Sequence, residues 1–350
     1  MKLKNAVFLD PSYDLYHKNG VFDLSNKIFN RDDQLLPFVK VKEYFESKGV
    51  PTNTADYLLN NQICANKNYY YSFGSLTYKK LINREDINFK AFFIMEPVIL
   101  APHLYKLIPE LTKIFEEVYV HNTEGKGYSL KDVDRSKLRK IYWPMPYDKV
   151  LADLWMKKDR KNKLVVINGN HNPKFRKPEF YSTRIKAMSA LSKYDAIDLY
   201  GRGWKNWYSK QALWPTYYLY IRKILKIYKG ECNSKYDVLS NYKFCLCFEN
   251  TPMEGYISEK IFDCFYAGTI PVYLGDPKVN EYIPKECYIN MREFDNYESM
   301  LDHIKNLTDE EINHMRNSAK NFMESKGKHI YTNFLINVFK QSGIVELKNN

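Results

Sequence analysis

Glycine, cysteine and long apolar runs are scarce in this chain of 350 residues. With only 14 glycines the chain is not collagen-like, and with six cysteines it is not a disulfide-stapled miniprotein. The longest uncharged apolar stretch lies near Leu213–Ile221, far short of the roughly 20 residues that span a bilayer. The apolar part of Met1–Leu9 is too short for a signal peptide. We therefore expect a soluble, cytoplasmic protein.

Motifs for common cofactors and metals are also missing. The chain contains neither a GxGxxG dinucleotide motif nor a GxxxxGK[ST] phosphate loop, and Gly201-Arg202-Gly203 lacks the third glycine of the first. The sequence therefore does not favour nicotinamide chemistry or kinase-type phosphoryl transfer. No CxxC, HxH or HxxxH pair occurs, so we expect no cofactor and no metal, with buried thiols in a reducing compartment. The six cysteines are Cys64, Cys232, Cys245, Cys247, Cys264 and Cys287.

Positive charge and aromatic side chains are both abundant. The formal net charge is +12, and aromatic residues make up 16% of the chain, including 30 tyrosines. A basic, aromatic-rich protein is suited to nucleic acid, an anionic membrane or a phosphorylated small molecule. Genomic base composition would enrich Lys and Tyr equally well, so charge narrows the class of partner without choosing one.

Short apolar runs alternate with helical patterns in both halves of the chain, which predicts two α/β domains, each a Rossmann-like parallel sheet, facing a cleft. A polar run at Lys157–Lys163, after the break at Tyr142–Pro146, is the candidate linker. We predict a first domain over 1–155, a second over 156–325, and a C-terminal helix in 326–350 that crosses back to the first. The expected strands are Ala6–Leu9, Asn68–Phe73, Ala91–Met95, Val118–His121, Leu164–Ile167, Ile197–Tyr200, Lys243–Phe248 and Thr269–Leu274, and the expected helices are Leu36–Lys48, Leu104–Phe115, Pro178–Lys193, Ser234–Ser240 and Glu259–Ala267.

The most informative stretch is Phe248–Pro277, which reads FENTPMEGYISEKIFDCFYAGTIPVYLGDP. A buried strand delivers Glu249 and Asn250 to its carboxyl end, and a loop then leads to a helix that Ser258 is expected to cap. The free N–H groups and positive dipole at that helix N-terminus suit a phosphate, and Lys260 adds a full charge. The alternative is a solvated Glu-Lys pair opening an ordinary helix.

The same stretch resembles the signature of the α-1,3-fucosyltransferases, glycosyltransferase family 10. The matching residues are Phe244-x-Leu246-x-Phe248-Glu249-Asn250-Thr251, Gly255-Tyr256-Ile257-Ser258-Glu259-Lys260 and Ala267-Gly268-Thr269-Ile270-Pro271-Val272-Tyr273-Leu274-Gly275. Ser258 stands where Thr is usual, Leu274 where Trp is usual and Cys264 where Ala is common. The resemblance is strong over 242–277, looser over about 90–300, and almost absent before residue 90.

The resemblance implies a GT-B glycosyltransferase that moves L-fucose from GDP-fucose to a saccharide hydroxyl with inversion and without an essential metal. It also implies that the first domain, 1–155, binds the acceptor and that the second, 156–325, binds the nucleotide-sugar donor. Carried over by motif position, Lys260 and Arg184 hold the diphosphate and Glu259 contacts the fucose hydroxyls. Asn250, Tyr256 and Glu249 complete the donor site. Arg184 has a second interpretation, as an exposed arginine on its helix.

An inverting mechanism needs a base for the acceptor proton. Glu96 follows the strand expected at Ala91–Met95 and stands in the Glu-Pro context that the resemblance associates with the base. We predict Glu96 as the general base. The rivals are Asp10 and Glu124, and the structural alternative is a glutamate that caps the following helix.

Other functions stay open. A related nucleotide-deoxysugar donor is the alternative within the enzyme class, and a basic nucleic-acid-binding protein is the alternative outside it, although no nucleic-acid motif is present. The expected acceptor is an oligosaccharide or glycolipid of lipopolysaccharide, another surface glycan or a glycoprotein. The basic, aromatic segment Tyr217–Lys229 either contacts an anionic membrane at the inner face, through Tyr218, Ile221, Leu225 and Tyr228, or packs on the donor domain.

Overall fold

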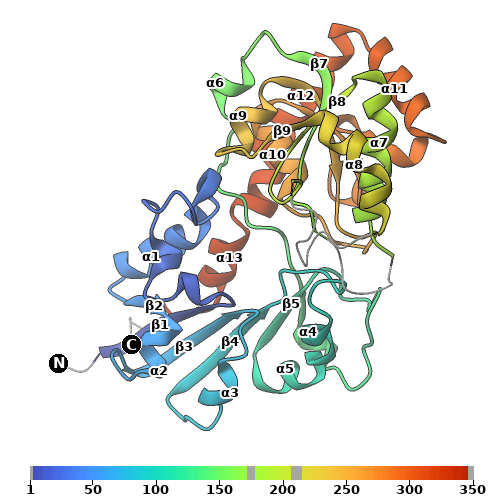
Figure 1. Cartoon of the computed structure of the whole chain (residues 1–350). Coiled ribbons are helices and arrows are strands. Elements are labelled where there is room, and N and C mark those ends of the chain that lie inside the picture. The colour runs from blue at the N-terminus through green and yellow to red at the C-terminus, as the bar shows by residue number, and fades with distance from the viewer. Residues whose placement is uncertain (1–2, 172–177, 206–214, 346–350) are drawn as a thin grey trace. The chain divides into compact units, whose positions relative to one another are not determined.

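The computed structural model describes residues 3–171, 178–205 and 215–345, which form two units (Figure 1). The first unit comprises Met1–Pro146 together with His329–Asn350, and the second comprises Tyr147–Lys328. The sequence predicts the first boundary at 155/156. The structure has it at 146/147 because the Tyr266 hydroxyl donates to the Tyr147 carbonyl and the Leu151 amide donates to the Tyr266 carbonyl, which ties 147–156 to the second unit.

The first unit is built on a six-stranded parallel sheet with the order β2-β1-β3-β4-β5-β6. Its strands are β1 (Leu3–Pro11), β2 (Thr52–Thr54), β3 (Ala65–Phe73), β4 (Ile87–Phe93), β5 (Glu117–Val120) and β6 (Leu138–Lys140). Its helices are α1 (Leu36–Ser47), α2 (Ala55–Leu59), α3 (Tyr78–Leu81), α4 (Pro102–Lys106), α5 (Ile108–Ile114) and α13 (Phe334–Gln341). Short 3-10 turns lie at η1 (Asp14–Tyr16), η2 (Gly20–Phe22), η3 (Arg31–Asp33) and η4 (Arg135–Lys137).

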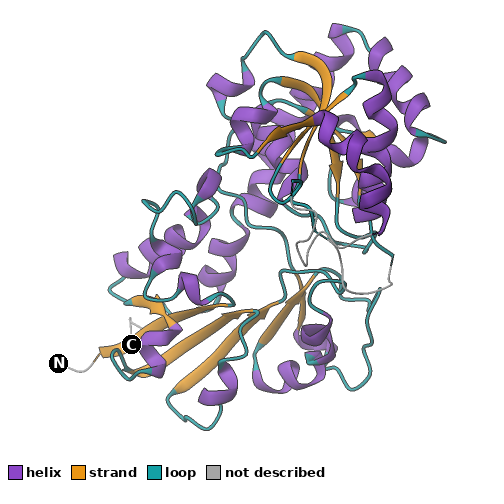
Figure 2. Cartoon of the chain, in the orientation of Figure 1, coloured by secondary structure: helices purple, strands orange, loops and turns teal. Residues whose placement is uncertain are grey.

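Helices lie on both sides of this sheet (Figure 2). Because side chains alternate along a strand, Tyr71 and Phe93 face α1 and α13, whereas Tyr70 and Phe92 face the other way, toward Phe115 just beyond α5. Helix α13 places Phe334, Leu335 and Phe339 in the core of the first unit.

The second unit repeats this plan, with a six-stranded parallel sheet in the order β12-β11-β10-β7-β8-β9. Its strands are β7 (Lys161–Ile167), β8 (Ile197–Tyr200), β9 (Tyr228–Gly230), β10 (Tyr242–Phe248), β11 (Ile270–Leu274) and β12 (Ile289–Asn290). Its helices are α6 (Ala152–Trp155), α7 (Tyr181–Leu191), α8 (Pro215–Ile227), α9 (Lys235–Leu239), α10 (Glu259–Ala267), α11 (Tyr297–Asn306) and α12 (Asp309–Phe322). Its 3-10 turns are η5 (Ser192–Tyr194), η6 (Val279–Glu281), η7 (Lys285–Cys287) and η8 (Met291–Glu293), and a π-helix, η9 (Met323–Thr332), crosses into the first unit.

The predicted alternation and the doubly wound fold class are confirmed, with local differences. The continuous apolar run Phe244–Phe248 is a buried central strand, as predicted. The helix expected over Leu104–Phe115 is two helices, because α5 starts anew with Pro109 in its first turn. The prediction of a linker at Lys157–Lys163 is wrong in part, because β7 starts at Lys161 and pairs with β10.

Helix α8 packs on the second unit through Ile221, Ile224 and Ile227, which are buried in its core with α7 and the sheet. The apolar face predicted from Ile221 and Leu225 therefore contacts protein. None of the helices within the described ranges is long and apolar enough to cross a bilayer.

Candidate functional site

The strand order of the second unit fixes where a ligand can bind. From β7 the chain runs outward to β8 and β9, then returns to β10 on the opposite side of β7 and continues to β11 and β12. Ligands of such sheets bind at the carboxyl ends of the strands where the order reverses, here β7 and β10. The motif residues predicted for the donor site follow β10 and open α10, and Arg184 lies on α7, which follows β7.

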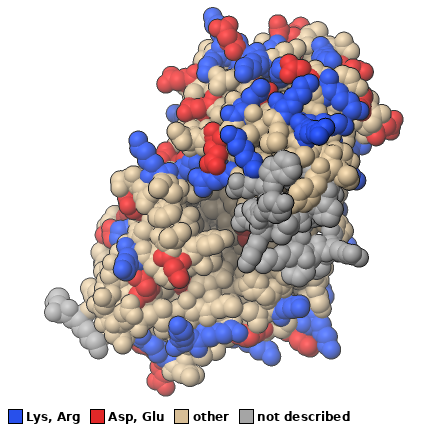
Figure 3. All heavy atoms as spheres, viewed as in Figure 1, with Lys and Arg blue, Asp and Glu red and all other residues tan. Residues whose placement is uncertain are grey.

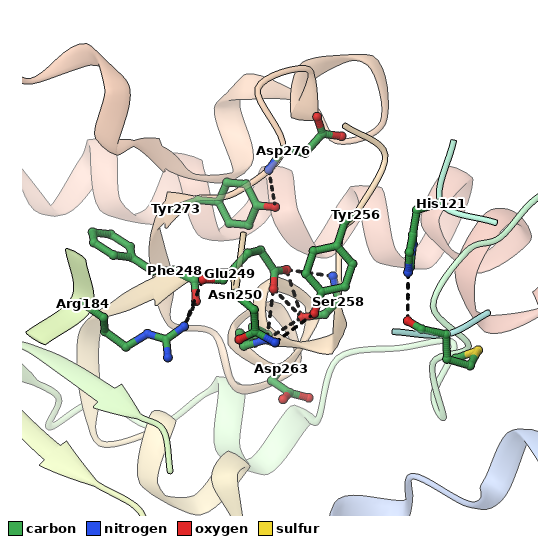
Figure 4. A network of polar contacts seen from close by, with 12 residues as sticks. His121, Arg184, Phe248, Glu249, Asn250, Tyr256, Ser258, Asp263, Tyr273 and Asp276 are labelled. Atoms are coloured by element: carbon green, nitrogen blue, oxygen red, sulfur yellow. Dashed lines mark hydrogen bonds and ion pairs between the residues drawn. The ribbon is translucent and has the colours of Figure 1, made fainter. Parts of the chain in front are cut away.

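Glu249 organises this edge from a fully buried position (Figure 4). Its carboxylate accepts hydrogen bonds from the Ser258 amide at 2.8 Å and from the Ser258 hydroxyl, and it forms an ion pair of 3.0 Å with the Lys260 ammonium. Ser258 does start α10, but its hydroxyl does not cap the helix as predicted, because it is engaged by Glu249 and Lys260. Glu249 therefore locks the entry to α10 and fixes Lys260.

Electrostatics keep Lys260 and Glu259 charged. Burial opposes the charge on Lys260, but the nearby carboxylates of Glu249 and Glu259 outweigh it and raise the pKa of the lysine. Burial likewise opposes the charge on Glu259, and here Lys260 and Lys235 outweigh it and lower the pKa of the carboxyl. Lys260 is therefore a permanent cation at the start of α10, where the helix dipole adds further positive potential.

Arg184 is buried, not exposed on its helix. Its Nη2 donates to the carbonyls of Phe248 at 2.7 Å and Glu249 at 3.0 Å, so the guanidinium lies against the carboxyl end of β10 (Figure 4). Its Nε is buried and has no hydrogen-bond partner among the described residues. Burial lowers the pKa of the guanidinium, yet an arginine remains protonated at any working pH.

Asn250 and Tyr256 close the loop between β10 and α10. The Asn250 amide donates to the Tyr256 hydroxyl at 3.3 Å, and the Asn250 carbonyl accepts from the Phe180 amide just before α7. Thr251 donates to the Pro178 carbonyl at 2.9 Å. These bonds join the loop to the start of α7, so the structure brings all six predicted donor-site residues to one edge of the sheet. Those residues are Arg184, Glu249, Asn250, Tyr256, Glu259 and Lys260.

A supporting network at the end of β11 was not predicted from the sequence. Asp276 is fully buried and accepts from the Gly255 amide at 2.9 Å, and the Arg292 guanidinium donates to the Gly275 carbonyl at 2.6 Å. A Cβ on Gly275 would lie 2.2 Å from the Tyr273 hydroxyl and 2.6 Å from Cγ of Glu249. Asp276 could have been found from the signal that identified Glu249, a carboxylate just after a buried strand.

Glu96, the predicted general base, lies in the first unit, three residues after β4. The segment that carries it is held at two backbone carbonyls: the Tyr105 hydroxyl donates to Glu96 at 3.1 Å, and the ring of His121 bonds to Met95 at 2.9 Å. Burial is the main cause that lowers the pKa of His121 to about 3, with Lys140 adding to it. The imidazole is therefore neutral and donates to the Met95 carbonyl.

The two rival bases have contrasting surroundings. Asp10, at the end of β1, is fully buried beside the Tyr70 hydroxyl, and burial raises the pKa of its carboxyl despite the hydroxyls nearby. Glu124 lies on the exposed loop after β5 and accepts from the Thr123 hydroxyl at 2.6 Å. The Tyr70 contact of Asp10 and the Thr123 contact of Glu124 do not involve Glu96.

Within the described residues no cluster of His, Cys, Asp and Glu has the arrangement of a metal site. Four cysteines are buried and two are partly buried, and all six are free thiols. The buried ones are Cys245, Cys247, Cys264 and Cys287.

Two Rossmann-like units in one chain define the GT-B class of glycosyltransferase folds. The crystal structure of an α1,3-fucosyltransferase has the same fold, with a TM-score of 0.51, 14% sequence identity, and coverage of 98% of this chain and 91% of that chain. The sequence profile described as glycosyltransferase family 10 (fucosyltransferase), C-terminal, matches residues 157–319. Residues 157–319 of the second unit are therefore similar to the C-terminal domain of glycosyltransferase family 10.

Two curated relatives show where the similarity lies. The α-(1,3)-fucosyltransferase FucT of Helicobacter pylori is 43% identical over 74 residues, which are 21% of this chain and 16% of that protein. The 4-galactosyl-N-acetylglucosaminide 3-α-L-fucosyltransferase 9 of Mus musculus is 29% identical over 148 residues, 41% of this chain and 33% of that protein. The chain thus matches less than half the length of either relative.

Proposed function

We propose that this chain transfers L-fucose from GDP-fucose to a hydroxyl of a saccharide acceptor, with inversion at the anomeric carbon and without an essential metal. The observation that carries the proposal is the placement of two cations, Lys260 and Arg184, at the carboxyl edge of β10 inside the domain that matches the family. The fucosyltransferases among the relatives support the choice of fucose.

In the proposed mechanism the second unit stabilises the leaving group. As the bond from fucose to the diphosphate breaks, negative charge grows on the GDP oxygens while the sugar gains oxocarbenium character. Lys260 and Arg184 are fixed in place before the reaction by Glu249 and by the carbonyls at the end of β10. Cations that need no reorganisation stabilise the transition state more than the ground state. Glu259, kept ionised by Lys260 and Lys235, accepts hydrogen bonds from the fucose hydroxyls.

The proposed base, Glu96, takes the proton of the acceptor hydroxyl as its oxygen attacks the anomeric carbon from the side opposite to GDP. GDP leaves with the electrons of the broken bond. Because the acceptor oxygen attacks from the opposite side, the configuration at the anomeric carbon inverts. A base for this step needs a defined position. Support for Glu96 is its rigid segment, held at the Met95 and Glu96 carbonyls by His121 and Tyr105.

The residues that depart from the family pattern favour the fucose donor over a related deoxysugar. Ser258 keeps the hydroxyl that would be present in the usual Thr, and this hydroxyl contacts Glu249 and Lys260. Leu274 is 9% exposed and packs in the core of the second unit. The Ser258 substitution therefore preserves the surroundings of Lys260, and Leu274 fills the core of the second unit. For the acceptor we propose a 4-galactosyl-N-acetylglucosamine unit of a surface glycan such as lipopolysaccharide, made in the cytoplasm, because the mouse relative is named for that disaccharide.

Nucleotide binding tests the proposal before any acceptor is known. We expect GDP to raise the unfolding temperature saturably, UDP to do so less, and EDTA to leave the GDP effect unchanged. Transfer is then assayed with GDP-fucose and 4-galactosyl-N-acetylglucosamine. Preference for another nucleotide would support the deoxysugar alternative. Salt-sensitive binding of generic oligonucleotides without any GDP effect would favour the nucleic-acid alternative and overturn ours.

Contact with an anionic membrane belongs to the same proposal, but through a different face of α8 than the sequence suggested. Lys and Arg gather on the second unit in Figure 3. On α8, Leu219 is 79% exposed and shares a face with the exposed Arg222, Lys223 and Lys226 because of their spacing. Of the three cations, Lys226 is close enough to Asp195 to contribute to the lowered pKa of that carboxyl. Each cation near an anionic surface contributes about 1 kcal/mol, and Leu219 provides an apolar anchor.

Vesicle sedimentation tests this contact. The triple variant Arg222→Gln/Lys223→Gln/Lys226→Gln should bind phosphatidylglycerol-containing vesicles roughly a hundredfold more weakly than the wild type. The variant Lys80→Gln/Lys113→Gln/Lys131→Gln, with the same net charge change at exposed positions of the first unit, is the matched control. Equal losses in the two variants would show that net charge alone is responsible and that α8 has no specific role.

A further inference from the structure

The sheet of the first unit has its own point of strand-order reversal. The chain runs from β1 to β2 on one side and then returns to β3, β4, β5 and β6 on the other, so the reversal lies between β1 and β3. By the rule that places ligands at the carboxyl ends of such strands, the end of β1 is a predicted binding position. The residue there is Asp10, and the chain continues into the segment 12–33.

Asp10 and His17 leave polar atoms unpaired at this position. Asp10 Oδ1 and His17 Nε2 are both buried without a hydrogen-bond partner among the described residues, and they lie 3.9 Å apart. The other oxygen of Asp10 accepts from the Tyr70 hydroxyl, which holds the carboxylate in place. Buried polar atoms are normally satisfied, so a facing pair that is not satisfied points to a site completed by a ligand.

His17 joins this buried pair to the surface. Its side chain is 23% exposed, and its Nδ1 lies 3.7 Å from Oδ1 of Asp14, whose side chain is 98% exposed. The imidazole thus lies between a buried carboxylate and an exposed one. A hydroxyl-bearing ligand that approaches Asp14 would meet the ring of His17 next.

Apolar side chains are exposed on the same segment. Tyr13 is 64% exposed, Leu15 66% and Ile28 77%, which is unusual for large apolar residues close together in sequence. Tyr13 is also fixed in orientation, because it packs edge-on against Tyr16, which packs in turn against Phe29. A sugar ring has an apolar C–H face and polar hydroxyls. An exposed, oriented aromatic ring can contact the C–H face, and the neighbouring carboxylates and imidazole can bond to the hydroxyls.

The charges indicate which ligand fits. Asp10 and Asp14 disfavour a phosphate, whereas carboxylates and an imidazole readily bond with neutral hydroxyls. The site also lies on the same sheet edge as Glu96, since β1, β3 and β4 are parallel neighbours. Two strand spacings separate the ends of β1 and β4, about 10 Å, which is the reach of a disaccharide.

From this combination we infer that Tyr13, Asp14 and His17 form the binding site for the acceptor saccharide, with Asp10 as the residue that positions His17. A pyranose ring packs on Tyr13, and its hydroxyls bond to Asp14 and His17. This inference rests on the proposed fucosyl transfer for its substrate class. It assigns to the acceptor a part of the chain outside the segment that matches the family.

Steady-state kinetics with GDP-fucose and 4-galactosyl-N-acetylglucosamine test the site. His17→Gln should raise the acceptor KM roughly three- to tenfold, as expected on losing one hydrogen bond to a sugar hydroxyl. Tyr13→Ala should raise it roughly three- to tenfold. The GDP-fucose KM and the slow hydrolysis of GDP-fucose by water should not change. His314→Gln and Tyr194→Ala, which alter exposed residues of the second unit, are the matched controls.

Asp10→Asn separates positioning from base catalysis. If Asp10 positions His17, the variant raises the acceptor KM, and combining it with His17→Gln adds little further. A loss of kcat at unchanged KM would make Asp10 the base and overturn its positioning role. Thermal unfolding with and without GDP identifies a variant that is merely misfolded, and His17→Gln and Tyr13→Ala, at less buried positions, then decide the inference.

The outcomes distinguish the site from the function. Transfer by the wild type together with an unchanged acceptor KM in His17→Gln and Tyr13→Ala would refute the site and leave the function standing. If GDP binds but no transfer occurs, saturation-transfer NMR with the same disaccharide decides. Binding that is lost in Tyr13→Ala supports the site, and no binding by the wild type refutes it. Absence of both GDP binding and transfer refutes the proposed function.

Discussion

The two units share one architecture but differ in how their functional residues can be recognised. Each has a six-stranded parallel sheet with one point of reversal and helices on both sides. In the second unit, Glu249 and Lys260 belong to one contiguous motif and are bonded to each other, and Arg184 of α7 is bonded to the end of β10. In the first unit, Asp10 lies near the end of β1, Glu96 follows β4 and His121 follows β5, and no motif joins them. A ligand that is the same in all relatives, such as a nucleotide, favours a contiguous motif like that of the second unit. A ligand that differs between relatives, such as an acceptor, permits scattered residues like those of the first unit.

Removing the proposed base would produce the largest difference between the units. Glu96→Gln should lower kcat by about 10² to 10⁴, because proton transfer to a positioned base is lost, while GDP binding stays unchanged. The measurement pairs steady-state transfer with calorimetric titration of GDP. Glu124→Gln, at the exposed rival position, serves as the control. An active Glu96→Gln enzyme would place the base elsewhere.

Removing the cation of the second unit should affect both chemistry and GDP binding. Lys260→Ala is expected to lower turnover by about 10² to 10³, as for the loss of one preorganised electrostatic donor. It also leaves the buried Glu249 carboxylate without its ion pair, so the unfolding temperature should fall. In the double variant Lys260→Ala/Glu249→Gln this unpaired charge is absent.

The matched control for Lys260 is Lys278→Ala. Lys278 forms an ion pair of 3.0 Å with Glu254, but its side chain is 51% exposed. Exposed pairs contribute little to stability because water screens them, so little change in turnover or in the unfolding temperature is expected. Turnover of the double variant equal to that of the wild type would rule out a role for Lys260 at the leaving group.

Gly275→Ala tests the packing behind the donor site. Its Cβ would clash with the Tyr273 hydroxyl and with Glu249, and overpacking of this kind costs about 1–3 kcal/mol. The free energy of unfolding from urea titration measures the loss. Gly127→Ala offers a contrast, since it has open space but a φ of +92°, so it isolates backbone strain of about 1 kcal/mol. Equal stability of Gly275→Ala and the wild type would show that Tyr273 can move aside.

The smallest expected effect is the pH dependence contributed by His121. Its pKa is about 3 in the folded chain against an ordinary 6.5, so below 6.5 the unfolded chain binds a proton that the folded chain does not. The stabilisation is complete above pH 6.5 and is lost as the pH falls toward 3, by up to about 1.4 kcal/mol per pH unit.

Urea titrations of the wild type and His121→Gln at pH 7 and pH 5 measure this contribution. The wild type should lose about 2 kcal/mol more than the variant, because glutamine can donate to the Met95 carbonyl but does not titrate. Parallel losses in the two proteins would mean that His121 is protonated in the folded chain.

Much of the fold could be predicted from the sequence because buried parallel strands are apolar on both faces. Phe244–Phe248 and Leu164–Ile167 are of this kind, and both are central strands. Short edge strands carry no such signal: β2 is Thr52–Thr54, which is polar, and it forms only because β1 offers it a partner. The boundary at 146/147 depends on bonds to Tyr266, which lies far along the chain.

The donor-site residues from Glu249 to Lys260 could be predicted because they are contiguous, but their partners could not. Nothing local indicates that Glu249 is fully buried and holds Ser258, or that Arg184 donates to the strand end. Likewise, Asp10 and His17 become a pair only when η1 folds back over the end of β1. Long-range contacts of this kind depend on the packed structure.

The return of α13 to the first unit has a consequence for biosynthesis. Residues 3–146 leave the ribosome first, yet Phe334, Leu335 and Phe339 complete their core. The second unit, 147–328, is contiguous and can finish folding while the first still has a gap in its core. The proposed acceptor half is thus the last to mature, and a nascent chain that stalls before residue 334 leaves core side chains such as Val41, Phe45 and Tyr71 without the helix that packs on them.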